Sequence, residues 1–326
     1  MACSSEGCRA VVAWGDGFFD AEHDEGRAFR WMAAHGHLEL TCTDGRDGFL
    51  ELWVRSELAD LRQKLTIRTG DVAETFSLPE GWSPVSVPVP AGVCRVELGV
   101  DPVLPAVHHP GDLRQLAVRV REAAVHRDPG RHRIARRRHA NAVRNLAEML
   151  AGEVELSSTP VTLGIDLHGV CNVNPPCVFC AYEEQKRLEG ERASAPFTAG
   201  TVETLGDFVD GAGLLVNCSI GEPFMKRDLP EILDAFADRG VTLEMSTNGQ
   251  ILTEGAVSSL VGRDVRLYVS VDAATAATYA RLRNDAFDRV VAHVRRLVEA
   301  KGGRGRLPLV FLVFMPMRAN LHELEA

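Results

Sequence analysis

The sequence has no stretch that could act as an export signal or cross a membrane. Its first residues, MACSSEGCRAVVAWGDG, contain neither the basic start nor the apolar core of a signal peptide. The longest apolar run, residues 307–317, is too short to span a bilayer and is interrupted by proline. We therefore expect a cytoplasmic protein with no membrane span.

The sequence also lacks an excess of positive charge. The chain of 326 residues has 36 lysines and arginines against 45 aspartates and glutamates, a formal net charge of −9. Binding to nucleic acid requires basic surface, so this balance argues against nucleic acid as a partner. In a reducing compartment the 8 cysteines should be free thiols or metal ligands, and seldom disulfides.

The first part of the chain has the alternating pattern of β-strands. Val96, Leu98 and Val100 alternate with polar or small residues, and residues 38–42 and 85–89 show the same period. Turn-forming Asp-Gly and Gly-Asp pairs separate such segments, and no long helical pattern interrupts them. This spacing predicts an all-β antiparallel sandwich over residues 1–126.

A basic segment follows the expected sandwich. In RHRIARRRHANAVRNLAEML, residues 131–150, Ile134, Val143 and Leu146 can share one face of a helix, with arginines elsewhere. Such a helix could contact nucleic acid or a membrane surface. We favour a linker helix, residues 127–154, that packs on the following domain and leaves its arginines in solvent.

The remaining residues, 155–326, change to a pattern of apolar strands alternating with helices. This order predicts a parallel α/β sheet. The expected strands are residues 161–167, 213–219, 241–246, 265–271 and 308–314. The expected helices are residues 201–210, 229–239, 253–261 and 287–300. Near the end, Asn320 is a candidate N-cap with Glu323 at the third helical position.

Three cysteines follow the first of these strands, in GVCNVNPPCVFC. Cys171, Cys177 and Cys180 have the spacing C-x5-C-x2-C. Two thiols would indicate a redox pair and four a closed zinc cage, whereas three leave a tetrahedral metal site one ligand short. The sequence therefore indicates a metal centre with one exchangeable position, although a zinc site with His168 as fourth ligand is a simpler alternative.

Small polar or charged residues also follow the next three strands. In parallel sheets, ligands bind at the carboxyl ends of the strands. These ends carry Ser219-Ile220-Gly221-Glu222-Pro223, then Ser246-Thr247-Asn248-Gly249, then Ser270-Val271-Asp272, with TYARLR shortly after the last. A structural scaffold would not require this ordered set.

Residues 159–326 resemble the radical S-adenosylmethionine (SAM) enzymes in these motifs and in their order. The resemblance implies a partial, TIM-like (β/α) barrel in which Cys171, Cys177 and Cys180 hold a [4Fe–4S] cluster. It implies that SAM binds the iron without a cysteine and is cleaved reductively to methionine and a 5′-deoxyadenosyl radical. That radical abstracts hydrogen from the substrate, and a flavodoxin or ferredoxin is the implied electron donor.

The same resemblance assigns roles around SAM. The three residues of the GEP motif would meet the methionine amino group, and polar residues at the next two strand ends would suit the ribose hydroxyls. An aromatic residue would face the adenine, and an arginine would bind the carboxylate. In that order the residues are Gly221, Glu222 and Pro223; Ser246, Asn248, Ser270 and Asp272; Phe179; and Arg283.

Two features depart from the family pattern. Five residues, instead of the more common three, separate Cys171 from Cys177, so the spacing does not identify the subfamily. The chain offers five β/α units where the family barrel usually has six, so it is apparently incomplete. No further cysteines are available for an auxiliary cluster in residues 181–326 apart from Cys218, which we expect to be a small core residue.

The first part of the chain bears on the substrate. GFFDAEHDEGRAFRWM, residues 17–32, with DPVLPAVHHPGDLRQLAVRV, residues 101–120, resembles β-sandwich modules attached to glycosyltransferases and methyltransferases of bacterial surface-polysaccharide pathways. That resemblance implies a sugar, nucleotide sugar or glycan-linked substrate. A peptide- or protein-modifying radical SAM enzyme is the first alternative, because SVDAATAATYARLR, residues 270–283, resembles a segment common in that branch. A zinc-stabilised binding protein without catalysis is the second.

Several residues have simpler interpretations. The aromatic residues Phe18, Phe19, Phe29 and Trp31 are expected in the sandwich core and not on a sugar-stacking surface. Asp166 and His168 should share one face of the first parallel strand, where they would face the barrel interior.

Overall fold

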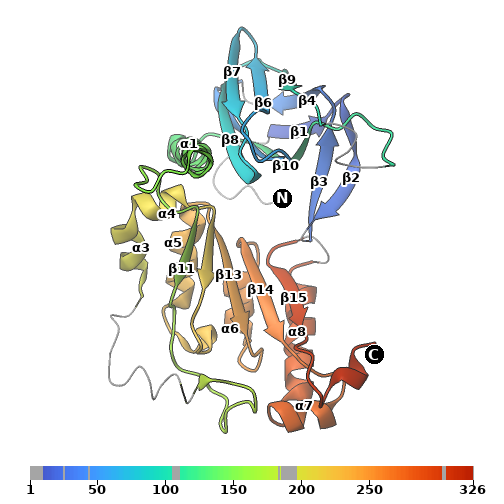
Figure 1. The fold of residues 1–326 in the computed structure, drawn as a ribbon, viewed down its shortest axis with the longest axis vertical. Helices are drawn as coiled ribbons and strands as arrows, with labels where there is room; N and C mark the ends of the chain where they lie inside the picture. Colours follow the sequence, from blue (N-terminus) through green and yellow to red (C-terminus); the bar gives the residue numbers. More distant parts are fainter. Residues whose placement is uncertain are drawn as a thin grey trace. The chain divides into compact units, whose positions relative to one another are not determined.

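The computed structural model describes residues 10–24, 26–42, 45–104, 111–182, 184, 197–302 and 306–325. The chain divides into two compact units (Figure 1). The first unit contains residues 1–161 with 210–213, and the second contains residues 162–209 with 214–326. No helix among the described residues is long and apolar enough to cross a membrane.

The first unit contains two antiparallel five-stranded sheets, which we call sheet A and sheet B. Sheet A has the order β1 (Ala10–Trp14), β4 (His35–Cys42), β9 (Arg95–Asp101), β6 (Lys64–Thr69) and β7 (Val72–Ser77). Sheet B has the order β2 (Phe18–Asp24), β3 (Arg27–Met32), β10 (Val118–His126), β5 (Gly48–Ser56) and β8 (Gly81–Val89).

The alternating apolar residues of both sheets form one core. Leu38 and Leu98 of sheet A belong to the same buried cluster as Leu52 and Val118 of sheet B. Side chains alternate between the faces of a strand, so this period places every second residue in the cluster. The predicted all-β sandwich is confirmed.

A second, smaller cluster involves sheet B. Phe29 and Trp31 are only 5% and 2% exposed, as expected for core aromatics. The Arg119 guanidinium carbon lies 4.9 Å and 4.8 Å from the centroids of these two rings. Phe29 and Trp31 therefore do not offer an open surface for sugar stacking.

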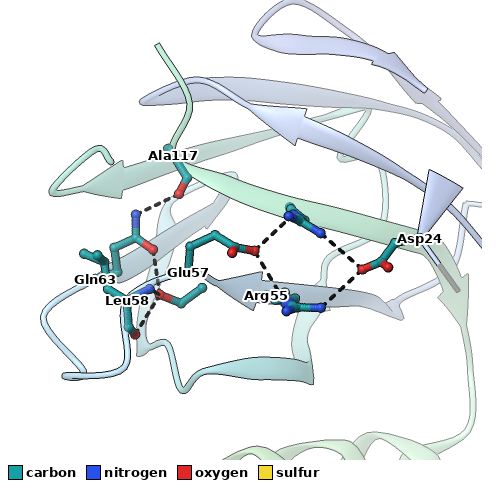
Figure 2. Close-up of polar contacts among 8 residues, drawn as sticks. Asp24, Arg55, Glu57, Leu58, Gln63 and Ala117 are labelled. Carbon is teal, nitrogen blue, oxygen red and sulfur yellow. Dashed lines mark hydrogen bonds and ion pairs between the residues drawn. The ribbon is translucent and has the colours of Figure 1, made fainter. Parts of the chain in front are cut away.

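Charged side chains beside this cluster form a network of ion pairs. Arg119 and Arg55 both pair with Asp24, at 3.1 Å and 3.2 Å, and both pair with Glu57, at 3.0 Å and 3.4 Å. Figure 2 shows Arg55 between the two carboxylates. Beside them the buried Gln63 donates to the carbonyl of Ala117 at 2.7 Å. Each positive charge thus has carboxylate partners within the same unit.

Helix α1 (Pro129–Ala151) begins at the N-cap Asp128, with proline in its first turn, and ends at Gly152 in the left-handed region, φ 70°. Two of its histidines, His132 and His139, lie 2.8 Å and 2.9 Å from hydroxyls of β8. The helix therefore contacts the sandwich. It also contacts residues expected from the sequence to belong to the following domain, because the Asn141 side chain donates to the carbonyls of Thr159 and Gly211, at 2.9 Å and 3.2 Å. The sequence predicted only the second of these contacts.

Most arginines of α1 are exposed, as expected, whereas Arg138 is buried. Arg131 pairs with Glu51 of β5 at 2.8 Å, and Arg136 pairs with Glu74 of β7 at 2.5 Å. Acidic residues on the strands attract the basic helix, which sequence periodicity alone does not reveal. The paired arginines are less available to bind phosphate groups, which weakens the nucleic-acid and membrane alternatives for this helix.

The second unit contains one parallel five-stranded sheet, as predicted. Its strands follow chain order: β11 (Thr162–Ile165), β12 (Leu214–Asn217), β13 (Thr242–Thr247), β14 (Val265–Ser270) and β15 (Leu309–Val313). The connecting helices are α3 (Ala199–Leu205), α4 (Asp207–Gly211), η2 (Pro223–Met225), α5 (Leu229–Asp238), α6 (Glu254–Leu260), α7 (Ala276–Leu282) and α8 (Phe287–Ala300), with η3 (Leu321–Glu323) after β15.

Helices pack against one face of this sheet. Leu267 and Val269 of β14 belong to the same buried cluster as Ile232 of α5, Val257 of α6 and Val290 of α8. The alternate strand positions Glu244, Arg266 and Tyr268 point to the other face and are only partly buried. The predicted partial (β/α) barrel is confirmed, and its open face is the one that these alternate positions share.

Two local expectations for this unit were wrong or incomplete. Helix α7, which begins at the N-cap Thr275, was not predicted from the sequence. Asn320 does not form the expected capping box, because its side chain donates instead to the carbonyls of Asp272 and Met315, at 2.8 Å and 2.9 Å. A short 3₁₀ turn, and not an α-helix, follows it.

Candidate functional site

The cysteine loop is tied to the segment that follows β12. The backbone N–H groups of Leu167 and His168 donate to the Ser219 hydroxyl, at 2.7 Å and 3.1 Å. A Cβ on Gly221 would lie 2.1 Å from the His168 carbonyl oxygen, so only glycine permits this approach. The glycine of the GEP motif thus brings its backbone against the loop that precedes the cysteines.

The three thiols lie close enough to influence one another. Burial raises the pKa of the Cys177 thiol, the Arg283 guanidinium opposes that shift, and Cys180 and Cys171 reinforce it. Cys171 and Cys177 are partly buried, and Cys180 is exposed. The three cysteine side chains therefore share one local electrostatic environment.

Nitrogen donors point at two of these sulfurs. The Asn248 side-chain amide lies 3.8 Å from the Cys171 Sγ, and the Arg283 Nη1 lies 3.6 Å from the Cys177 Sγ. N–H donors around cysteine sulfur are the surroundings that iron–sulfur clusters use. The donor set of this loop therefore fits a [4Fe–4S] cluster.

The described residues contain no group of three or more His, Cys, Asp or Glu side chains gathered closely enough to hold a single metal ion. A cluster does not require such convergence, because each cysteine binds a different iron. His168 is partly buried, and burial together with Lys226 lowers its pKa.

Glu222 is enclosed by protein and is only 1% exposed. Its carboxylate accepts hydrogen bonds from the Thr247 hydroxyl at 2.7 Å and from the Asn248 backbone N–H at 2.8 Å. Burial raises its pKa, and these hydrogen bonds oppose the shift. Glu222, a predicted SAM contact, thus connects the GEP motif to the end of β13 through hydrogen bonds.

The predicted ribose contacts lie in different surroundings. Ser246 is exposed and Ser270 is partly buried at the ends of β13 and β14. Asn248 donates to the Asn172 side chain at 2.8 Å, inside the cysteine loop. Asp272 is 1% exposed and has φ 57°, in the left-handed region.

Arg283 connects several predicted site residues. Its Nε donates to the Asp272 carboxylate at 2.9 Å, and its guanidinium carbon lies 5.2 Å from the centroid of the Phe179 ring. The backbone N–H of Val178 donates to the Leu282 carbonyl at 3.0 Å, which joins the cysteine loop to the end of α7. The structure therefore brings Phe179, Asp272, Arg283 and Cys177 together.

Asn320 and Glu323 also contribute contacts to this site, which the sequence did not predict. Glu323 accepts hydrogen bonds from the hydroxyls of Thr275 and Thr278, at 2.6 Å and 2.7 Å. The capping pattern predicts a local role for these two residues and does not indicate partners elsewhere in the chain. The one sequence feature that could have indicated such partners is that these polar residues follow an apolar strand.

Cys218 corrects another expectation. It is exposed, and a Cβ on Gly164 would lie 3.2 Å from its sulfur. The core interpretation was wrong because this residue follows β12 on the open face of the sheet. Asp166 is exposed and the intervening Leu167 is buried, so Asp166 and His168 share that face, as predicted.

Comparison with known proteins agrees with these features. Residues 165–323 match the family described as the Radical SAM superfamily. The chain is 30% identical over 155 residues to the AdoMet-dependent heme synthase of Methanosarcina barkeri, covering 45% of this chain and 42% of that protein. It is 31% identical over 163 residues to a probable GTP 3′,8-cyclase of Metallosphaera sedula, covering 49% and 48%. The chain thus spans less than half the length of these relatives.

Among solved structures, the fold is similar to that of SuiB from Streptococcus suis bound to S-adenosylmethionine. The TM-score is 0.44 and the identity 18%, and the match covers 57% of this chain and 40% of that chain.

Proposed function

We propose that residues 165–323, which match the Radical SAM superfamily, form a catalytic domain that cleaves SAM reductively and abstracts hydrogen from an organic substrate. The superfamily uses a [4Fe–4S] cluster together with SAM. One observation carries the proposal: the three thiols of the C-x5-C-x2-C loop lie together, with N–H donors directed at two of their sulfurs.

Cys171, Cys177 and Cys180 would hold the cluster. When bound, the cluster supplies the electron that cleaves SAM and leaves one iron without a cysteine. The protein's own contribution is to orient the cofactor and exclude water. The surroundings of Cys177, which include Phe179 and Arg283, support this division of roles.

The proposed SAM site uses the same strand ends. Ser246 and Ser270 have side chains available on the open face for ribose hydroxyls, and Phe179 suits the adenine. Glu222 and Asp272 are buried and bonded to protein groups, so we assign them to holding the backbone at this site. Gly221 and Pro223 would then present backbone to the methionine end of SAM.

A sugar or glycan-linked substrate is our proposal for the whole chain. Besides the sandwich resemblance, sheet A offers an open concavity of about 660 Å³ lined by His35, Arg62, Lys64, Thr66, Arg68, Thr75, Glu97, Leu98, Gly99, Val100 and Asp101. Its mixed donors and acceptors suit hydroxyl groups. Glycan binding by the full-length protein, lost on substitution of Lys64 and Asp101, would support this; modification of a peptide without glycan binding would count against it.

The central test is cofactor content and SAM cleavage. Protein reconstituted anaerobically should hold about four irons and four sulfides per chain, the composition of one such cluster. With dithionite and SAM it should then release 5′-deoxyadenosine, slowly in the absence of substrate. Stoichiometric zinc with no iron, or a full cluster with no 5′-deoxyadenosine, would refute the proposal.

A further inference from the structure

Arg283 lies where the end of α7 meets the cysteine loop. Its backbone N–H donates to the Tyr279 carbonyl at 2.8 Å, which completes the last turn of the helix. The preceding residue, Leu282, accepts from the Val178 N–H at 3.0 Å. The backbone of Arg283 is therefore fixed relative to the segment between Cys177 and Cys180.

Asp272 fixes the guanidinium of Arg283. One carboxylate oxygen accepts from the Met315 N–H at 2.7 Å, and the other accepts from both the Nε and the Nη2 of Arg283. The Asp272 carbonyl accepts from the Asn320 side chain at 2.8 Å. Asp272 is buried and adopts a positive φ, so it has little freedom to move.

The other end of α7 is held by Glu323. Its carboxylate accepts from the Ala274 N–H at 2.8 Å, as well as from the Thr275 and Thr278 hydroxyls. Hydrogen bonds from these two threonines lower the pKa of Glu323 to about 2, so it is ionised at neutral pH. Residues 315–323 thus contact both ends of α7. Glu323 binds its first turn directly, and Met315 and Asn320 bind Asp272, which in turn binds Arg283 at its end.

These contacts also fix the position of Nη1, the third nitrogen of the Arg283 guanidinium. A guanidinium is planar and rigid, so fixing its Nε and Nη2 also fixes its Nη1. That nitrogen lies 3.6 Å from the Cys177 sulfur, within hydrogen-bonding range of sulfur. Hydrogen bonds to cysteine sulfur are one of the factors that set the reduction potential of iron–sulfur clusters.

We infer that Arg283 is a positioning residue for the cluster, which donates a hydrogen bond to the Cys177 thiolate and raises the reduction potential of the cluster, and that Asp272, Asn320 and Glu323 hold it in that place. This inference rests on the proposed function, because it requires a cluster on Cys177. Reduction adds negative charge to the cluster, and a donor at the sulfur stabilises that charge. The family resemblance placed Arg283 on SAM instead.

The test measures the midpoint potential without SAM. Wild-type protein, Arg283→Met, Arg283→Lys and Glu323→Ala are reconstituted anaerobically and titrated with dithionite, and the reduced cluster is followed by electron paramagnetic resonance. Arg283→Met should make reduction roughly tenfold less favourable, a decrease of about 59 mV for a one-electron couple. Arg283→Lys keeps the charge but lacks the rigid fork, so it should shift the potential in the same direction. Glu323→Ala should produce a smaller decrease, whereas Glu323→Gln, which keeps one acceptor oxygen, should restore most of it.

Arg289→Met is the matched control, because it removes the same charge from an exposed position on α8. Potentials of the Arg283 variants equal to this control would overturn the inference. If those variants keep the potential but lose SAM affinity, Arg283 serves the SAM carboxylate and the proposed function stands. If wild-type protein assembles no cluster, the proposed function itself fails.

Discussion

Two arginines, one in each unit, have similar immediate surroundings and different consequences. Arg119 lies over Phe29 and Trp31 and pairs with Asp24 and Glu57. Arg283 lies near Phe179 and pairs with Asp272. Both are largely buried, with side chains 17% and 8% exposed.

The difference lies in what the remaining donors face. All the contacts given above for Arg119 are with rings and carboxylates of the sandwich, so its place there is explained by packing and charge balance. Arg283 has a third donor directed at a cysteine sulfur in a loop suited to a cluster. A buried arginine beside an aromatic ring and a carboxylate can therefore be structural, like Arg119, or functional, like Arg283. The contact with a cysteine sulfur distinguishes the two.

The largest effect should be the loss of iron when cysteines of the loop are replaced, because only the second unit is proposed to bind a cluster. Replacing Cys171, Cys177 or Cys180 with alanine removes a thiolate that binds one of the irons, so iron content should fall from about four per chain to less than one. Iron and sulfide assays after anaerobic reconstitution measure this. Cys94→Ala, in the sandwich, and Cys218→Ala, on the open face of the sheet, are the controls. Iron retained by all three loop variants would contradict the cluster assignment.

Two buried glutamates should give opposite dependences of stability on pH. Burial alone would raise the pKa of Glu51, but His126 and Arg131 lower it to about 2. It therefore adds stability at high pH that is lost as pH falls from about 4.5 through about 2, up to about 3 kcal/mol. Burial raises the pKa of Glu222, so its contribution is present at low pH and is lost as pH rises through that raised pKa.

Unfolding free energies of wild-type protein, Glu51→Gln and Glu222→Gln, measured from pH 3 to pH 8, would test this contrast. Each variant should lack the part of the pH dependence that its glutamate supplies. Variants that run parallel to wild type across the whole range would show that neither group titrates in this way.

Arg119→Met tests the structural member of the arginine pair. The change leaves Asp24 and Glu57 with one arginine partner, so the free energy of unfolding should fall by about 2 kcal/mol. Denaturant titration measures the loss. The midpoint potential of the cluster should match that of wild type, and a shift as large as that of Arg283→Met would abolish the distinction between the two arginines.

The smallest effects should come from two helix N-caps. Asp128→Ala at α1 and Thr275→Ala at α7 should each reduce stability by about 1 kcal/mol, through loss of a side-chain hydrogen bond to the first turn. Only Thr275→Ala should also lower the cluster potential, because Thr275 is bonded to Glu323. Equal potentials in both variants would show that α7 tolerates loosening at its start.

The sequence by itself determined the type of sheet in each of the two units. A period of two produced the sandwich, and alternation of apolar strands with amphipathic helices produced the parallel sheet with α5, α6 and α8 close to their expected ranges. The cysteine loop and its neighbouring strand ends were also predicted, because parallel strands bring their carboxyl ends to one edge. These features depend on local pattern, which the sequence displays directly.

Only the tertiary structure decided which protein groups the individual site residues contact. Glu222 and Asp272, which were predicted to contact SAM, are buried, and their carboxylates are bonded to Asn248 and Arg283. Arg283 and Cys177 are 106 positions apart, and Glu323 reaches the start of α7 across 45 to 49 positions. The sandwich likewise determined where α1 packs, through Glu51 and Glu74. Pairings over such distances depend on chain topology and side-chain packing, and no local period encodes them.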